Sequence, residues 1–398
     1  MPTLLQISLS VSNHSVGGIA KSIGHCAIEN GWNSYITYTD RILKTDCDST
    51  LIKIGSNFDY FLHFLLTRFT DLHGLGSYFS TKKLIRKIEE INPDIIQIHN
   101  LHGYYLNYKL LFKYLNRVDI PVVWTFHDCW SFTGHCSHFV TVNCEKWKVN
   151  CNNCPLTRNY PKSFVDNSSY NYRLKKKIFT GNKNLHIITV SQWLADFVKE
   201  SFLKAKDIRV IHNGIDINAF NYNMIKSKKT FTILGVSRIW NKNKGLYDLY
   251  KLRNLLDENY KIIIVGLTAE QVKDLPEGIE GITRTRDLNE LMNLYKNANV
   301  LVNPTYADSF PTVNLEALAC GTPVITYRTG GSPEAVDENT GIVVEQGNIN
   351  GIIEAINTIR NTKDKYTPFL CRKRAEVLFD KDICFKKYIE FYKTLLNC

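Results

Sequence analysis

The sequence predicts an α/β protein made of two doubly wound domains, each a parallel sheet with helices on both of its faces. Short strand-like runs alternate with helical stretches along the chain, which is typical of parallel sheets. The chain has 398 residues, which at about 150 residues per domain corresponds to two or three domains. Hydrophobic residues make up 44% and charged residues 22%, a balance that excludes wholesale disorder and a collagen-like or coiled-coil chain.

The first domain is predicted to span residues 1–215, with a cysteine-rich insertion at about 129–160. Its expected strands are Leu4–Ser10, Trp32–Tyr38, Asp94–His99, Val122–His127 and Leu185–Val190. Its expected helices are Gly17–Asn30 after a glycine turn, Ser80–Ile91 with Thr81 as a cap, and a helix that Ser191 caps and that runs through Glu200.

The second domain is predicted to span residues 216–380, beginning after the turn at Asn213-Gly214. Its expected strands are Phe231–Val236, Lys261–Val265, Val300–Asn303, Pro323–Thr326 and Gly341–Val344. Its expected helices are Tyr247–Leu256, Leu288–Asn297, Val313–Ala319 and Ile349–Arg360. Residues 381–398 form a final amphipathic helix that can pack back on the first domain, and the basic stretch 222–230 is interpreted as a surface linker or domain edge.

The charge balance favours an anionic partner. Lysine and arginine number 49 and aspartate and glutamate 38, which gives a net charge of +11. No recognisable nucleic-acid-binding motif accompanies this charge, so nucleic acid is not expected as a partner. No run of 18 apolar residues is present, and the start MPTLLQISLS lacks the basic region of a signal peptide. We therefore expect a cytoplasmic protein with reduced thiols, although its 11 cysteines are an odd number.

Two phosphate-binding fingerprints are absent. Neither G-x-G-x-x-G nor G-x-x-x-x-G-K-[ST] occurs, which disfavours a hydride-transfer enzyme and a P-loop NTPase. Gly17-Gly18 before a helix could still cradle an anion, because helix N-termini present free N–H groups; a plain turn is the alternative.

The segment 300–334, VLVNPTYADSFPTVNLEALACGTPVITYRTGGSPE, carries the most specific motif. Asp308 follows a strand, and eight positions later Glu316 opens the run E-A-L-A-C-G-T-P-V. This pattern resembles family 4 of the retaining glycosyltransferases, the glycosyl transferases group 1, with Asp308 where the family usually has Glu. The resemblance implies the GT-B fold, two Rossmann-like domains facing each other across a cleft.

The resemblance also implies a nucleotide-sugar donor site. Glu316 would accept two hydrogen bonds from ribose hydroxyls, and the loop with Ser309, Phe310 and Thr312 would offer N–H groups to phosphate or sugar oxygens. Arg238 and Lys244 match the family's pyrophosphate-binding positions, with Lys242 a weaker third candidate. Two cations would neutralise the departing diphosphate, so no metal is required for catalysis.

Two further residues are predicted to act on the sugars. His127, at the end of an apolar strand, corresponds to a family histidine that contacts the donor sugar, although a lone histidine there can equally be structural. Asp308 is predicted to hydrogen-bond sugar hydroxyls without attacking the anomeric carbon, with the departing phosphate taking the acceptor proton. The triplet Asp46-Cys47-Asp48 resembles a metal-binding D-x-D motif, but such triplets are frequent by chance.

Four cysteines lie within nineteen residues, in the pattern C-x7-C-x6-C-x2-C: Cys136, Cys144, Cys151 and Cys154. Four thiolates could close a tetrahedral structural zinc site, with His135 and His138 as substitutes. Free thiols packed in a loop are the alternative. The sequence around these cysteines resembles an insertion found in one branch of the same family.

Residues 58–69, FDYFLHFLLTRF, are apolar and aromatic on most faces but too few to span a bilayer. With the basic run Arg173, Lys175, Lys176 and Lys177 they could line an acceptor groove or attach to an anionic membrane; a buried core helix with a solvated basic run is the alternative.

These patterns together predict a retaining glycosyltransferase. It would move sugar from a nucleotide-sugar to a saccharide or polyprenyl-linked acceptor in surface polysaccharide biosynthesis, as the branch of bacterial exopolysaccharide and O-antigen enzymes implies. It would be cytoplasmic or peripheral on the inner face of the membrane. A GT-B sugar-nucleotide epimerase and a non-catalytic sugar-nucleotide-binding protein are the alternatives.

Overall fold

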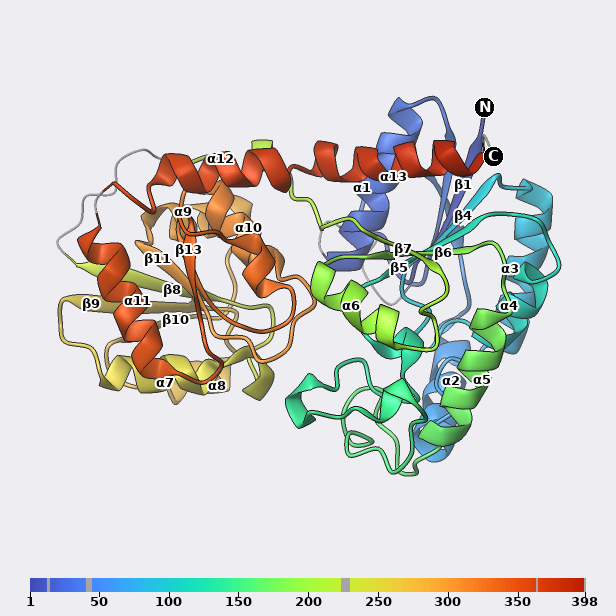
Figure 1. The fold of residues 1–398 in the computed structure, drawn as a ribbon, viewed down its shortest axis with the longest axis horizontal. Helices are drawn as coiled ribbons and strands as arrows, with labels where there is room; N and C mark the ends of the chain where they lie inside the picture. The colour runs from blue at the N-terminus through green and yellow to red at the C-terminus, as the bar shows by residue number, and fades with distance from the viewer. Residues whose placement is uncertain (13–14, 41–44, 223–229, 363, 397–398) are drawn as a thin grey trace. The chain divides into compact units, whose positions relative to one another are not determined.

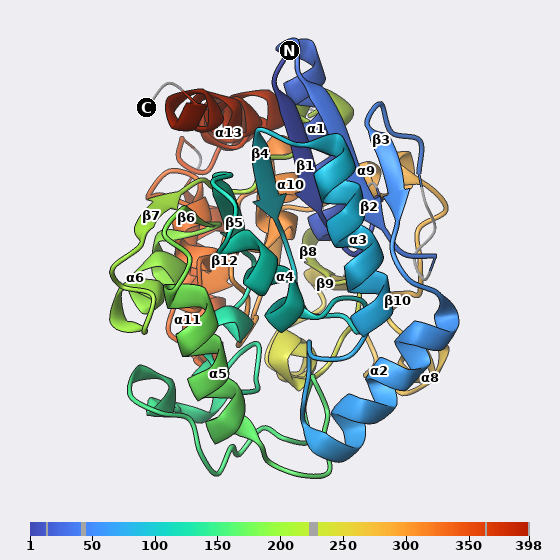
Figure 2. The same ribbon diagram turned by 90° about the vertical axis from the view of Figure 1, so that its right-hand side faces the viewer.

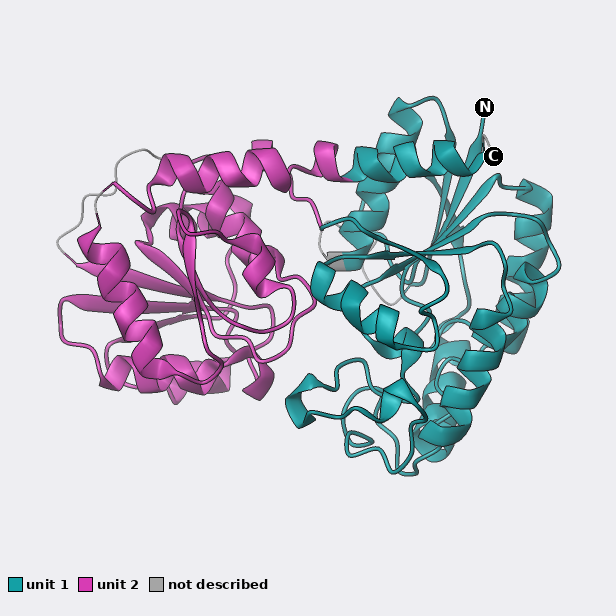
Figure 3. Ribbon diagram, in the orientation of Figure 1, with its two compact units in different colours: residues 1–212, 385–398 teal, residues 213–384 magenta. Residues whose placement is uncertain are grey.

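The computed structural model describes residues 1–12, 15–40, 45–222, 230–362 and 364–396, and the chain forms two compact units (Figure 1, Figure 3). Unit 1 comprises residues 1–212 and 385–398, and unit 2 residues 213–384. The basic stretch 222–230 falls almost entirely outside the described residues.

Unit 1 is built on a seven-stranded, all-parallel sheet of order β3-β2-β1-β4-β5-β6-β7 (Figure 2). Its strands are β1 (Thr3–Ile7), β2 (Asn33–Tyr38), β3 (Thr50–Lys53), β4 (Ile95–Ile98), β5 (Val122–Phe126), β6 (Leu185–Thr189) and β7 (Asp207–Val210). Its helices are α1 (Ser15–Glu29), α2 (Asn57–Thr70), α3 (Tyr78–Ile91), α4 (Tyr108–Leu115), α5 (Ser168–Thr180), α6 (Gln192–Glu200) and most of α13 (Lys381–Leu396).

Helices cover both faces of this sheet. Val123 of β5 belongs to one apolar cluster with residues of α1 and α13, while the neighbouring Trp124 contacts the rings of Phe112 on α4 and Phe179 on α5. Because successive strand residues point to opposite faces, α1 and α13 lie on one side of the sheet and α4 and α5 on the other. The final helix thus packs on the sheet of unit 1, where the Tyr392 hydroxyl donates to Gln97 Oε1 over 2.8 Å.

Unit 2 has a six-stranded, all-parallel sheet of order β10-β9-β8-β11-β12-β13. Its strands are β8 (Phe231–Val236), β9 (Tyr260–Val265), β10 (Ile279–Ile282), β11 (Val300–Asn303), β12 (Val324–Tyr327) and β13 (Gly341–Val344). Its helices are α7 (Leu246–Asn254), α8 (Ala269–Lys273), α9 (Leu288–Asn297), α10 (Thr312–Ala319), α11 (Ile349–Asn361) and α12 (Pro368–Leu378).

The sheet orders explain where loops gather. In both units the strand order reverses beside the first strand, β1 in unit 1 and β8 in unit 2. The loops that follow β1 and β4, or β8 and β11, therefore leave neighbouring strands at the carboxyl edge, which is where doubly wound sheets bind ligands.

Several local predictions meet a clear outcome. Ser191 caps α6 as predicted, because its hydroxyl accepts from the Leu194 amide. Thr81 is not a cap: α3 begins earlier, at Tyr78, and the Thr81 hydroxyl instead donates to Ser77 O and accepts from the Asn107 amide. No helix within the described ranges is long and apolar enough to cross a membrane.

Candidate active site

Two loops at the carboxyl edge of the unit 2 sheet are joined by an ion pair. Lys244 follows β8 and Asp308 follows β11, and Lys244 Nζ lies 2.6 Å from Asp308 Oδ2. Both side chains are about a quarter to a third exposed, 30% and 24%, so the pair is reachable from solvent. The two predicted donor-site residues, 64 positions apart in the chain, thus form one charged unit.

Gly245 makes this approach possible. Its φ is +73°, and a Cβ at this position would lie 2.1 Å from the Pro304 carbonyl oxygen. The Asn243 carbonyl accepts from the Tyr306 amide over 2.7 Å, which ties the same two loops a second time. The loop after β8 can therefore lie directly on the loop after β11 only if residue 245 has no side chain.

Asp308 is held through both carboxylate oxygens. Oδ2 pairs with Lys244, and Oδ1 accepts from the Phe310 amide over 3.2 Å. The Phe310 N–H is therefore engaged within the protein and is not one of the amides available to a ligand. Asp308 acts here as the group that orients Lys244.

Gly330 packs against the backbone of Asp308. It has a φ of +57°, and a Cβ there would lie 1.6 Å from the Asp308 carbonyl oxygen. We expect Gly330→Ala to destabilise the protein by about 3 kcal/mol or more, since strain and overlap add. Gly31→Ala is the control, because Gly31 has a φ of +79° with no atom within 4 Å; it should cost only about 1 kcal/mol. Equal losses in urea unfolding would contradict the close approach.

Helix α10 begins directly after the Asp308 loop. Pro311 precedes it and no side chain caps it, so the first-turn amides, among them those of Thr312 and Val313, have no side-chain acceptor at the N-cap. Ser309 is buried and its hydroxyl has no hydrogen-bond partner in the described structure. Phe310 packs its ring 5.8 Å from that of Phe379, which makes it a core residue.

Glu316 lies on α10 and is partly buried. The buried Tyr295 hydroxyl donates to Glu316 Oε2 over 2.8 Å. Burial first, and then the nearby Glu316 charge, raises the pKa of Tyr295 well above its usual range, so the phenol stays protonated and keeps donating. Tyr295 thereby fixes the orientation of this carboxylate, a partner that sequence reasoning missed.

Arg238 follows β8 and is exposed, with no ion pair to any described residue. It is thus near the same strand end as Lys244 but is not part of the ion pair.

A second acidic residue, Asp248, is buried at the start of α7 and accepts from the hydroxyls of Tyr306 and Tyr327 over 2.7 and 2.8 Å. Asp248 anchors the Tyr306 segment of the Asp308 loop, and no sequence motif pointed to it.

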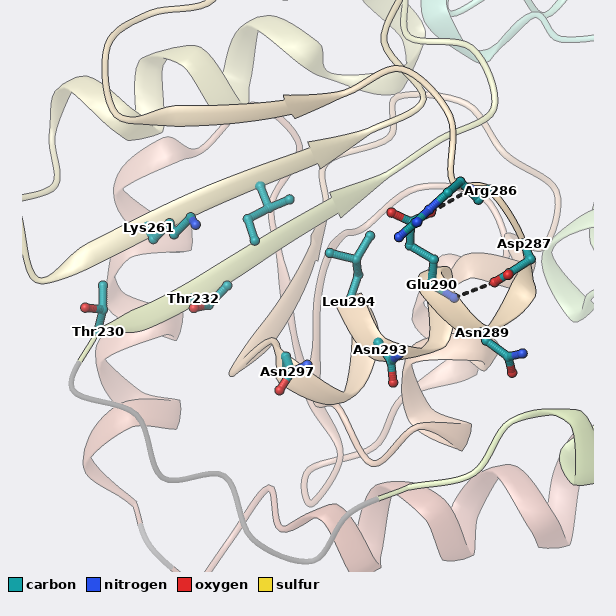
Figure 4. Close-up of a pocket in the computed structure, with 11 residues that line it drawn as sticks. Thr230, Thr232, Lys261, Arg286, Asp287, Asn289, Glu290, Asn293, Leu294 and Asn297 are labelled. Atoms are coloured by element: carbon teal, nitrogen blue, oxygen red, sulfur yellow. Dashed lines mark hydrogen bonds and ion pairs between the residues drawn. The ribbon is translucent and has the colours of Figure 1, made fainter.

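A hollow of about 770 Å³ lies elsewhere in unit 2, between the beginnings of β8 and β9 and helix α9 (Figure 4). Thr232, Lys261 and Asn293 are among its lining residues. Its lining runs along α9 from Arg286 to Asn297, and none of the predicted donor-site residues is among its lining residues.

In unit 1 the predicted start of the first helix, after a turn at Gly17-Gly18, is wrong, while the anion cradle at these glycines stays a prediction. Helix α1 begins at Ser15, so Gly17 and Gly18 lie inside its first turn. A Cβ on Gly17 would lie 2.6 Å from Ser12 Oγ and 2.8 Å from Ser10 Oγ. Gly17 therefore allows the loop after β1 to pack tightly on the helix.

His127 follows β5 and stacks on His99, which follows β4. The ring centroids are 5.6 Å apart, and His127 Nε2 lies 3.3 Å from His99 Nδ1. Burial lowers the pKa of His127 to about 4, so the ring is neutral at physiological pH. The next residue, Asp128, accepts from His102 Nε2 over 2.8 Å, an interaction that the sequence did not suggest.

The cysteine cluster is described in the insertion of unit 1. The thiols of Cys136 and Cys154 hydrogen-bond each other, and the Gly134 amide donates to Cys151 Sγ. The hydrogen bond with Cys136 lowers the pKa of Cys154 to about 7, whereas burial raises that of Cys151 to about 12. Over the residues that the structure describes, no group of three or more His, Cys, Asp or Glu side chains is arranged to hold a metal ion.

The zinc hypothesis stays a prediction with a direct test. If four thiolates bind zinc, purified protein should contain about one zinc per chain, and Cys151→Ser or Cys154→Ser should lose it and destabilise unit 1. Metal-free protein of full stability would support packed free thiols. The two aspartates of the D-x-D triplet are exposed and Cys47 is partly buried, and Asp48 pairs with His25 Nδ1 over 2.6 Å.

Comparisons with known proteins identify two domains in this chain. Residues 57–219 match the family model described as Glycosyltransferase Family 4, and residues 230–361 match Glycosyl transferases group 1. Asp308 and Glu316 lie within the group 1 match. The chain thus carries, in this order, a match to a Glycosyltransferase Family 4 domain and a match to a Glycosyl transferases group 1 domain.

Three similar proteins cover nearly the full chain. The putative colanic acid biosynthesis glycosyl transferase WcaC of Escherichia coli (strain K12) is 23% identical over 98% of this chain and 100% of its own length. Sucrose-phosphate synthase from Thermosynechococcus elongatus superposes with a TM-score of 0.72 at 16% identity, covering 100% of both chains. Anabaena HepE in complex with UDP-glucose superposes with a TM-score of 0.64 at 16% identity, covering 98% of this chain and 99% of HepE. The predicted GT-B fold is confirmed.

Proposed function

We propose that this glycosyltransferase moves a sugar from a nucleotide-sugar to a saccharide or polyprenyl-linked acceptor in bacterial surface polysaccharide biosynthesis, with retention of configuration. The observation that carries the donor part is the Lys244–Asp308 pair beside the uncapped N-terminus of α10. A cation and free amides at one strand edge suit a diphosphate. HepE in complex with UDP-glucose and the name of WcaC support the donor class and the setting.

In this proposal each residue has a defined task. Lys244, oriented by Asp308, neutralises the diphosphate as the glycosidic bond breaks, and Arg238, which follows the same strand, would be a second cation. Glu316, held by Tyr295, accepts from the ribose hydroxyls. The acceptor hydroxyl attacks from the face that the diphosphate leaves, and the phosphate takes its proton, so no carboxylate attacks carbon. Motion of the two units that excludes water would favour transfer over hydrolysis.

A thermal-shift screen over nucleoside diphosphates and their sugars, followed by mass spectrometry of transfer products, tests this function. Stabilisation by one diphosphate family, with transfer to a saccharide or polyprenyl-linked saccharide, is expected. Conversion of UDP-GlcNAc without any acceptor would support the epimerase alternative. Tight donor binding with neither transfer nor slow hydrolysis would support a non-catalytic binding protein.

We also propose that unit 1 contacts an anionic membrane through α2. Of the described residues of α2, only His63 and Thr67 are buried, so the alternative of a core helix is wrong. Phe58 and Phe69 are 68% and 61% exposed, and the Arg68 guanidinium lies between the Phe64 and Phe164 rings. An apolar face bordered by cations suits a bilayer with acidic headgroups.

The basic run of residues 173–177 offers fewer surface cations for a membrane contact than its sequence suggested, because one of its lysines points inward. Lys175 is buried, donates to the Trp130 and Thr133 carbonyls and lies 3.3 Å from the Trp130 ring centroid. Burial lowers its pKa to about 7. Arg173, Lys176 and Lys177 remain exposed.

Co-sedimentation with vesicles tests the membrane contact. The protein should bind vesicles rich in phosphatidylglycerol, and the double variant Phe58→Ser/Phe69→Ser should bind about tenfold or more weakly, since two exposed aromatics no longer insert. Leu255→Ser, at a 57% exposed site in unit 2, is the control and should bind normally. Equal binding by both variants would contradict the role of α2.

A further inference from the structure

A row of polar side chains crosses three neighbouring strands of unit 1. Gln6 lies on β1, His99 directly follows β4, and His127 directly follows β5. Gln6 Oε1 is 3.1 Å from His99 Nε2, and His99 Nδ1 is 3.3 Å from His127 Nε2. Gln6 and His99 are fully buried, so no solvent intervenes to satisfy these atoms.

The orientation of the Gln6 amide is determined by α1. Gln6 Nε2 donates to the Ala20 carbonyl over 2.9 Å, and a carbonyl can only accept. The amide oxygen must therefore face His99. Because Gln6 Oε1 can only accept, His99 Nε2 must carry the proton in this bond.

The tautomer of His99 in turn determines the tautomer of His127. Burial, and then the neighbouring His127, lowers the pKa of His99 well below its usual range, so His99 is neutral and its Nδ1 carries a lone pair. The partner of that lone pair, His127 Nε2, must then carry a proton. Since His127 is also neutral, its Nδ1 is an acceptor, and no described residue bonds to it.

We propose that Gln6 and His99 are positioning residues that fix the tautomer of His127, so that His127 Nδ1 accepts a hydrogen bond from a substrate hydroxyl. The inference rests on the proposed function for the identity of that substrate, a sugar. With this tautomer the site binds a ligand group that donates a hydrogen bond. A hydroxyl can donate to His127 Nδ1, whereas a carboxylate, a phosphate oxygen or a fluorine at the same position cannot.

The free protein tests the tautomer without any substrate. Nitrogen-15 spectra of histidine-labelled protein, with His127 assigned by its loss in His127→Ala, should show a protonated Nε2 and an unprotonated Nδ1. His99 should show the same pattern. A protonated Nδ1 on His127, or a His127 that is charged at neutral pH, would overturn the proposal.

Matched glutamine variants test the relay itself. Gln6→Met removes the acceptor for His99 Nε2, so both histidines should populate the second tautomer and their nitrogen signals should move. Gln97→Met is the control: Gln97 pairs with Gln6 in register and is equally buried, but bonds to Thr125 and Tyr392 and to neither histidine. Its His127 signals should stay unchanged. Identical spectra for Gln6→Met and the wild type would overturn the relay, and the wild-type spectrum decides the tautomer even where a variant does not fold.

Activity adds a separate readout. With the donor identified, kcat/KM should fall about tenfold in Gln6→Met, as for the loss of one hydrogen bond, and a sugar with fluorine at the contacted position should react poorly. If no donor supports transfer, the proposed function fails while the spectra of the free protein still decide the tautomer. Full activity of Gln6→Met alongside a shifted tautomer would overturn the link to substrate.

Discussion

Replacing Lys244 with alanine is expected to lower kcat/KM for sugar transfer by about 10² or more. Lys244 is the cation that the Asp308 carboxylate orients at 2.6 Å, and a preorganised charge on a leaving diphosphate contributes several kcal/mol where water is excluded. Arg238→Ala should also reduce the rate. Steady-state kinetics with the identified donor measure the change.

Lys242→Ala provides the matched control for this prediction. Lys242 lies two residues earlier in the same short helical turn but is exposed and makes no ion pair with a described residue. Lys242→Ala should leave kcat/KM within about twofold of the wild-type value, as expected for the loss of a solvated surface charge. Near-wild-type transfer by both Lys244→Ala and Arg238→Ala would remove the donor-site assignment.

Asp308→Asn is expected to keep donor binding and to lower turnover by about 10². The amide is nearly the same size but lacks the charge that holds Lys244, so the cation is no longer aimed when charge develops on the phosphate. Asp308→Glu should be tolerated, because it keeps the charge and restores the residue usual in the resembled family. Calorimetry of donor binding and single-turnover rates separate the two effects.

The stereochemistry of the product tests the same assignment. Retention is expected, with Asp308 engaged by Lys244 and the Phe310 amide and therefore not attacking carbon. Inverted product seen by NMR from an α-linked donor would contradict retention. A glycosyl ester trapped on Asp308 and detected by mass spectrometry would contradict the proposed same-face route.

Local sequence was a reliable guide to the elements that short-range interactions specify. Apolar runs predicted the central strands of both units, and the Ser191 cap was correct because a cap depends on only three neighbouring residues. The edge strands β3, β7 and β10 were missed, since their side chains are largely partly buried or exposed and show no apolar run. Helix starts at Ser15 and Tyr78 were misjudged because tertiary packing, of Gly17 on Ser12 and of Thr81 on Asn107, decides them.

By itself, the sequence determined the α/β class, the two domains' alternating elements and the set of residues from Arg238 to Glu316 that resembles a donor site; the roles of those residues stay predictions. Only the tertiary structure decided which groups meet. The Lys244–Asp308 pair, the Tyr295 partner of Glu316 and the row from Gln6 to His127 join residues 21 to 93 positions apart. Parallel strands bring such residues together because each crossover returns the chain to the same edge of the sheet. The burial of a side chain likewise depends on all of its tertiary neighbours. Lys175 was for this reason predicted as a surface charge from the sequence, whereas in the fold it is buried inside unit 1.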